Sequence, residues 1–111
     1  MTQVFVYKKD KHIARVVCDG HTGYGKEGED IVCAALSSIV QTAVLGLVSV
    51  AAVNIDLRRD DKKGYLEFTL PDDLNQTKRQ NADVILDTML LGITDLYEAW
   101  SDFIELDIKG A

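Results

Sequence analysis

The chain has 111 residues, which suit one domain with a modest hydrophobic core, and we expect residues 1–111 to form that single domain. Twelve basic residues against eighteen acidic ones give a net charge of -6. This balance argues against direct nucleic-acid binding, which needs clustered lysine and arginine to neutralise phosphates, and it suits a basic protein partner.

The N-terminal third predicts a β-hairpin followed by a loop. Residues 4–7 and 12–18 are rich in β-branched and aromatic side chains, and the polar residues 8–11 between them suit a turn. Four of the chain's eight glycines then fall between residues 20 and 28; they are Gly20, Gly23, Gly25 and Gly28. Because glycine permits tight turns and a close approach of two backbones, we interpret this segment as a loop that can accommodate an extended peptide.

A helix is expected to begin near Asp30, whose side chain suits a cap or first-turn position. Apolar residues then recur at spacings of three and four: Ile31, Ala35, Leu36, Ile39, Val40, Ala43, Val44 and Leu47. We expect the helix to fray at Gly46. Residues 31–53 contain no charged side chain, so a membrane span is an alternative; interspersed serine, threonine and glutamine favour a buried core helix and no membrane contact.

The second half predicts another hairpin, a second helix and a last strand. Residues 51–57 and 65–70 alternate apolar with polar or small side chains around a polar turn. The second helix could begin at Asp72, Asp73 or Asn75. Its apolar face is expected to carry Ile85, Met89, Ile93, Leu96, Tyr97 and Trp100. Residues 103–108 alternate again and predict the final strand.

The expected order of elements is ββαββαβ. This order predicts an α+β fold, a two-layer sandwich in which two main helices pack on one mostly antiparallel sheet. The methionine and aromatic side chains of the second helix are interpreted as core residues, so we expect no cofactor. No further cysteine or histidine lies at metal-ligand spacing, so we expect no metal site.

The two cysteines, Cys18 and Cys33, indicate the compartment. A small secreted domain usually carries more cysteines and pairs them, and the N-terminal residues lack the basic, apolar and small-residue order of a signal peptide. We therefore expect a cytoplasmic protein with free thiols. Cys18 falls in a predicted strand and is interpreted as a core residue, and His12 as a surface turn residue.

Cys33 and His21 are candidates for a nucleophile and its base. A cysteine attacks as the thiolate, which a helix N-terminus, a nearby histidine cation and partial exposure all favour. Cys33 lies about three residues into the expected helix, where free backbone N–H groups could also hold an oxyanion. His21 precedes Cys33 by twelve residues, within the glycine-rich segment. Alone, each is more often a buried small hydrophobe or an ordinary loop residue; together in one loop–helix unit they indicate nucleophilic catalysis.

The sequence around these two residues forms a recognisable pattern. It consists of Gly20-His21, Gly23-Tyr24, Gly28, Asp30-Ile31-Val32-Cys33-Ala34-Ala35 and Ser37. This pattern resembles the signature of the ribosomal-processing cysteine protease Prp family. Thr22 stands where a small residue such as alanine is expected. Outside the loop and first helix, the resemblance is one of residue types, chain length and element order.

The resemblance implies a bacterial cysteine endopeptidase that forms homodimers. It implies removal of a short N-terminal extension from a large-subunit ribosomal protein, by cleavage after an aromatic residue, as a step in ribosome assembly. His21 would be the general base and Cys33 the nucleophile. Asp30 would cap the helix or orient the histidine, and Ser37 would support the same helix face or be an ordinary helix residue. The substrate would lie along a loop containing Gly20, Gly23, Tyr24, Gly25 and Gly28.

Two other functions compete with this hypothesis. The same loop could dock a ribosomal partner without chemistry, which would make the chain a non-catalytic binding module. The cysteine could also serve a hydrolase or transferase of small acyl groups. Thiol reactivity distinguishes the first alternative, because a catalytic Cys33 should react with iodoacetamide faster than Cys18 does. Small acyl substrates would reveal the second.

Overall fold

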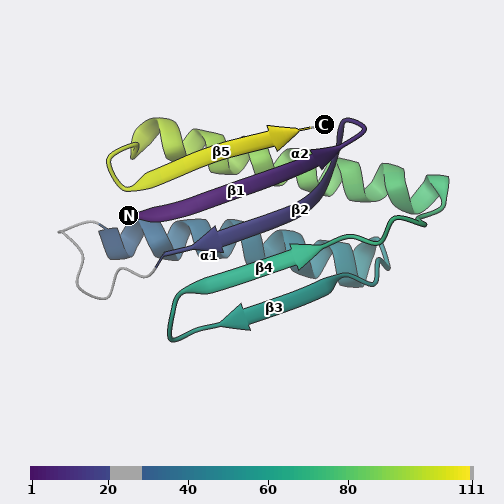
Figure 1. Ribbon diagram of the computed structural model, residues 1–111, viewed down its shortest axis with the longest axis horizontal. Helices are drawn as coiled ribbons and strands as arrows, with labels where there is room; N and C mark the ends of the chain where they lie inside the picture. Colours follow the sequence, from purple (N-terminus) through teal and green to yellow (C-terminus); the bar gives the residue numbers. More distant parts are fainter. Residues whose placement is uncertain (21–28, 111) are drawn as a thin grey trace.

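The computed structural model describes the backbone of residues 1–20 and 29–110 (Figure 1). It describes the side chains of residues 1–20 and 31–110. The described elements follow the expected order ββαββαβ. They are β1 (Thr2–Lys9), β2 (His12–Asp19), α1 (Glu29–Leu45), the π-helical turn η1 (Gly46–Val50), β3 (Asp56–Asp60), β4 (Tyr65–Thr69), α2 (Gln76–Ala99) and β5 (Ile104–Gly110). The predicted α+β class is confirmed.

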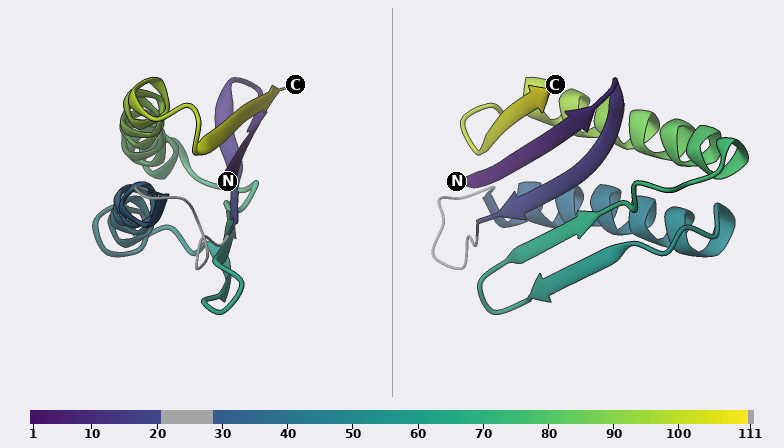
Figure 2. Two further views of the ribbon diagram at one scale, coloured as in Figure 1. Left: turned by 90° about the vertical axis from the view of Figure 1, so that its left-hand side faces the viewer. Right: turned by 45° about the vertical axis from the view of Figure 1, so that its right-hand side comes forward.

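One sheet of five described strands, in the order β3-β4-β2-β1-β5, forms the first layer. The pairs β1–β2, β2–β4 and β3–β4 are antiparallel, and β1–β5 is parallel, so the sheet is mostly antiparallel, as predicted. Both helices cover the same face of this sheet, as the left view of Figure 2 shows. The molecule is therefore a two-layer sandwich.

The hydrophobic core lies between the sheet and the two helices. Strand alternation directs one side of β1 inward, where Thr2, Val4 and Val6 are buried. The helices contribute residues at three- and four-residue spacing. These are Val32, Leu36, Val40 and Ala43 from α1, and Ala82, Leu86, Met89 and Ile93 from α2.

The first half of the predicted third strand is not a strand. The structure starts β3 at Asp56, although Ala51 and Val53 are buried as the alternation predicts. The backbone N–H of Val53 donates to the carbonyl of Leu47, 2.8 Å away. This segment therefore provides a hydrogen-bond donor for a carbonyl at the end of the helical region and does not pair in the sheet. Ala52 adopts a positive φ of 55°, which turns the chain away from α1.

The second helix begins after a capping residue and ends at Ala99, just before Trp100. Asn75 is its N-cap, and the Asn75 side chain accepts a hydrogen bond from the Lys78 backbone N–H at 2.9 Å. The prediction that Trp100 lies on the apolar helix face is wrong. Trp100 follows the last helical residue, is 43% exposed, and packs its ring against Phe103 at a centroid distance of 6.1 Å.

The long apolar segment Ile31–Val50 satisfies the length and composition of a membrane span, a criterion that the core helix of a folded protein also meets. One face of this segment packs in the core, as expected of a core helix. Only a minority of its side chains is buried, however, and Ile31, Leu45 and Val50 are exposed. The outer helical surface is therefore apolar and uncovered in a single chain.

Candidate active site

Cys33 lies where the first helix meets the start of β1, an inner strand of the sheet. The helix begins at Glu29, one residue before the expected Asp30, so Cys33 is its fifth residue. The Cys33 side chain is partly buried, and its Sγ lies 2.9 Å from Oγ1 of Thr2 on β1. The sulfur therefore has a hydrogen-bonding partner from the sheet and sits near the positive end of the helix dipole.

Gly20 brings the end of β2 against the start of β1. Its φ is +147°, and a Cβ at this position would lie 2.7 Å from both the Met1 carbonyl oxygen and the Thr2 Cα. The Gly20 N–H also donates to the carbonyl of Gly64 at 3.3 Å. Only glycine allows this approach. The last described residue before His21 is thereby held beside Thr2, the residue that contacts the Cys33 sulfur.

A pocket of about 350 Å³ opens beside Cys33, between α1 and the β3–β4 hairpin. Its inner part is apolar and its rim is polar. The inner part includes Cys18, Leu36, Val40 and Leu66; the rim includes Ser37, Gln41, Arg59, Asp61, Gly64 and Tyr65. A concave apolar site with a few polar groups beside a partly exposed thiol suits one or two apolar groups of a ligand.

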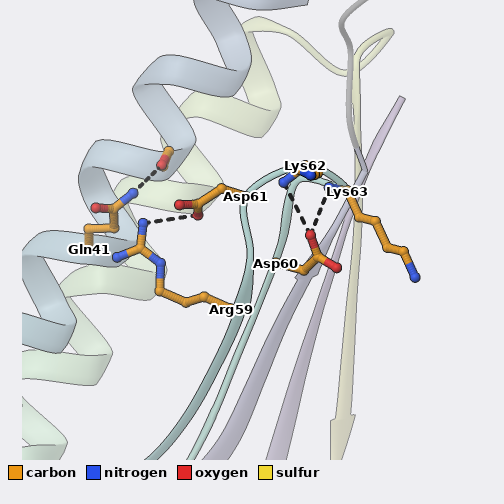
Figure 3. A network of polar contacts seen from close by, with 7 residues as sticks. Gln41, Arg59, Asp60, Asp61, Lys62 and Lys63 are labelled. Carbon is orange, nitrogen blue, oxygen red and sulfur yellow. Dashed lines mark hydrogen bonds and ion pairs between the residues drawn. The ribbon is translucent and has the colours of Figure 1, made fainter.

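The rim of the pocket carries polar contacts within each of the two layers. Figure 3 shows Arg59 reaching from β3 toward Gln41 on α1. The Arg59 guanidinium donates to Asp61 at 3.1 Å, and the Gln41 side-chain amide donates to Ser37 Oγ at 2.6 Å. In the adjoining turn, the Asp60 carboxylate accepts from two backbone N–H groups. These contacts fix the turn that closes this end of the pocket.

The structure brings together some of the predicted site residues. Cys33, Ser37 and Gly20 line the same pocket. Asp30 is in the first turn of α1. The other predicted positions lie outside the described residues: His21, Gly23, Tyr24, Gly25 and Gly28.

Sequence reasoning missed Thr2, Arg59, Asp61 and Tyr65 as residues of this pocket. Thr2 carried one usable signal, since it is a polar residue in the inward-facing row of β1 that otherwise holds valines. Arg59 and Asp61 carried none, because a charged hairpin turn is ordinary at a protein surface.

The two thiols have different environments. Cys18 is buried on β2, as predicted, and burial raises the pKa of its thiol to about 12. At pH 8, a thiol with that pKa is ionised in only about one molecule in ten thousand. Cys18 is therefore an inert core residue, although it lines the inner part of the pocket.

Iodoacetamide is expected to alkylate Cys33 at least about 100-fold faster than Cys18 at pH 8, because the Cys18 thiol is buried and protonated. Trypsin separates the two cysteines, since Lys26 lies between them, so mass spectrometry of a time course gives both rates from one sample. Equal rates in the folded protein would contradict the difference between the two environments. Urea-unfolded protein is the control, in which the two rates should converge.

Comparison with known families matches residues 1–105 to the family described as cysteine protease Prp. The chain is 30% identical over 97 residues to the ribosomal processing cysteine protease Prp of Staphylococcus aureus (strain NCTC 8325), covering 87% of this chain and 88% of that protein. It is 27% identical over 93 residues to the Bacillus subtilis (strain 168) protein of the same name, covering 84% and 83%.

Solved structures extend the similarity to the fold. SMU.848 from Streptococcus mutans has a TM-score of 0.88 and 28% identity, covering 100% of this chain and 96% of that one. The S. aureus ribosomal processing protease Prp in complex with a substrate peptide has a TM-score of 0.88 and 28% identity, covering 98% and 100%. The same protease with a covalently linked product peptide has a TM-score of 0.84 and 29% identity, with the same coverage.

Proposed function

Because the chain belongs to the cysteine protease Prp family, we propose that it removes the N-terminal extension of a large-subunit ribosomal protein in the bacterial cytoplasm. The chain is a cysteine protease. Its relatives are named ribosomal processing proteases, and a solved relative holds a substrate peptide, which supports a ribosomal protein as substrate. The net charge of -6 suits a basic ribosomal protein. Maturation of that protein would contribute to ribosome assembly.

The contact of Cys33 with Thr2, at the edge of the pocket, is the observation that carries the assignment of Cys33 as nucleophile. Of the two thiols, only Cys33 combines partial exposure, a position near a helix N-terminus and a hydroxyl partner. We assign His21 as the base from the Gly-His pair and the spacing in the sequence. Gly20, which precedes it, packs against Thr2.

The reaction has two halves. The Cys33 thiolate attacks the scissile carbonyl carbon, and backbone N–H groups at the start of α1 hold the resulting oxyanion. The imidazolium of His21 protonates the leaving amine as the C–N bond breaks, which leaves a thioester on Cys33. His21 then removes a proton from water, which attacks the thioester and releases the acid product and the Cys33 thiolate, so that the thiolate and the imidazolium are both restored. Asp30 orients His21 or supports the helix start.

The pocket beside Cys33 is proposed to receive the side chain that precedes the scissile bond. Its apolar inner part and volume of about 350 Å³ suit an aromatic ring, and the backbone of the peptide would then follow the glycine-containing segment of residues 20–28.

Incubation with a peptide that spans the extension and its junction, followed by mass spectrometry, tests the function. Cleavage after one aromatic residue supports it; tight binding without cleavage would favour the binding module, and turnover of small thioesters alone would favour an acyl hydrolase.

We also propose that a second copy of the chain covers the outer helical surface. A groove of about 740 Å³ separates α1 from α2 on the side away from the sheet, and it is lined mainly by apolar and small residues: Ala35, Ser38, Ile39, Thr42, Ala43, Gly46, Val84, Ile85, Thr88 and Met89. Exposed Ile31 and Leu45 on α1 and Leu91 on α2 continue the apolar area. A continuous exposed apolar patch marks an interaction site, and a surface that is the same on both partners suits a two-fold dimer.

Val84→Asp and Leu91→Asp are each expected to shift the protein from dimer to monomer. Both side chains are exposed on α2 and lie seven residues apart, on one side of the helix. Burying a new carboxylate in an apolar interface costs several kcal/mol, or about a 100-fold loss of affinity or more. Analytical ultracentrifugation measures the change. Leu57→Asp on β3, another exposed apolar position, is the matched control and should leave the mass unchanged; a wild-type monomer would contradict the proposal.

A further inference from the structure

We propose that Thr2 is a positioning residue for the nucleophile: its hydroxyl holds the Cys33 sulfur and donates a hydrogen bond to the thiolate. This inference rests on the proposed role of Cys33 and extends the site to the first strand of the sheet. The observation behind it is the 2.9 Å distance between Thr2 Oγ1 and Cys33 Sγ.

The chemistry of the two groups gives this contact a direction. With a neutral thiol, either group can donate the hydrogen bond. A thiolate has no proton to donate, so in the reactive form only the Thr2 hydroxyl can be the donor. A hydrogen bond to an ionised acceptor is stronger than one between neutral groups. The contact therefore supplies a donor to the reactive thiolate, and it also fixes the direction in which the sulfur points.

The burial of Thr2 also points to a specific role for its hydroxyl. Thr2 is 4% exposed and is the one buried polar side chain among the residues whose side chains the structure describes. The inward positions that follow it on β1 are Val4 and Val6, and valine has the same shape as threonine without the hydroxyl. Packing alone would thus be satisfied by valine at position 2. The hydroxyl must be paired to be tolerated there, and its partner is the Cys33 thiol.

The backbone of Thr2 is held on both sides. Its N–H donates to the carbonyl of Phe103 at 3.0 Å, and it pairs with Ile104 in the parallel β1–β5 register. On the other side, Gly20 packs directly against the Thr2 Cα. A side chain on a strand fixed in this way positions a partner more precisely than one on a free terminus. The contact joins residues 31 positions apart and links the sheet to the start of α1.

The test compares Thr2→Val, which replaces the hydroxyl with a methyl group of similar size, with Thr2→Ser, which keeps the hydroxyl. Thr2→Val is expected to lower kcat for the ribosomal peptide by about 10- to 100-fold, the effect of losing one hydrogen bond to a charged group, with KM changed less than about 2-fold. The rate of Cys33 alkylation by iodoacetamide at pH 8 should fall in the same variant, because the hydroxyl no longer holds the sulfur. Thr2→Ser should restore both within about 3-fold of the wild-type protein.

Each outcome decides the proposal. A Thr2→Val protein with the wild-type alkylation rate and kcat would overturn it, as would a Thr2→Ser protein as impaired as Thr2→Val. Thr2→Ala provides a second hydroxyl deletion if Thr2→Val does not fold, and thermal unfolding by circular dichroism checks each variant. Alkylation needs no substrate, so the Thr2 contact is tested even if the peptide is not cleaved. Cleavage by Cys33→Ala would instead reject the proposed nucleophile, whatever Thr2 does.

Discussion

Cys33→Ala is expected to abolish peptide cleavage, with a loss of at least about 10⁴-fold in kcat, because alanine offers no nucleophile for the scissile carbonyl. The fold should be retained. Cys33 is only partly buried, and alanine is a better helix former than cysteine, so we expect the free energy of unfolding to change by less than about 1 kcal/mol. Mass spectrometry of the peptide digest measures the first effect, and urea unfolding measures the second.

Cys18→Ala is the matched control, since it removes the other thiol of the same pocket. It keeps the nucleophile and should still cleave the same bond, with any effect of the altered pocket wall appearing in KM. Its stability should fall by about 1–2 kcal/mol, because it leaves a small cavity beneath the sheet. A Cys33→Ala protein that cuts the same bond would show that the nucleophile is wrongly assigned. If the native and Cys33→Ala proteins both bind the peptide and neither cuts it, the chain binds its partner without this chemistry.

The fold was largely predictable from local patterns. The β-branched and aromatic composition of β1 and β2, the alternation in β4 and the three- and four-residue spacing in α1 and α2 each predicted an element that the structure contains. Asn75 was among the predicted helix starts because its side chain can accept a backbone N–H. The parallel pairing of β1 with β5 follows from how the chain passes over α2, which no local pattern encodes.

The failed expectations have tertiary causes. Residues 51–55 alternate in burial like a strand, but the Val53 N–H is used by the carbonyl of Leu47 and is not available to a neighbouring strand. Trp100 continues the apolar spacing of α2 beyond Ala99, where the chain turns and its ring meets Phe103. In both cases the pattern gave the burial or the spacing and could not give the backbone path.

The candidate site, like the fold, was predictable from the sequence only in part. Helical spacing alone places Ser37 one turn from Cys33, and both line the pocket. The contact between Thr2 and Cys33 depends on the place of β1 between β2 and β5 and on the packing of α1 over the sheet, so a motif search around Cys33 does not reach it. The charged rim from Arg59 and Asp61 likewise arises from the position of the β3–β4 hairpin.

Gly20→Ala is expected to reduce cleavage by at least about 100-fold and to lower the free energy of unfolding by about 1–3 kcal/mol, because a side chain at this φ is strained. The added Cβ would lie 2.7 Å from the Met1 carbonyl oxygen and from the Thr2 Cα, which are backbone atoms. Relief of the clash must therefore move β1 or the end of β2. Either movement displaces Thr2 from Cys33 or changes the place where the chain leaves β2 toward His21.

Gly92→Ala makes the same chemical change where the structure has room, and it should have the opposite effect on stability. Its Cβ would meet the Ile39 side chain at 3.5 Å, an ordinary contact, and alanine is favoured over glycine within a helix by about 0.5–1 kcal/mol. The stability measured by urea unfolding and the cleavage per folded molecule should thus both fall for Gly20→Ala and be maintained for Gly92→Ala. If Gly20→Ala matched the wild-type protein in both, β2 and β1 would not need this close approach. The glycine of the Gly-His pair would then serve the peptide alone, and not the packing that holds Thr2.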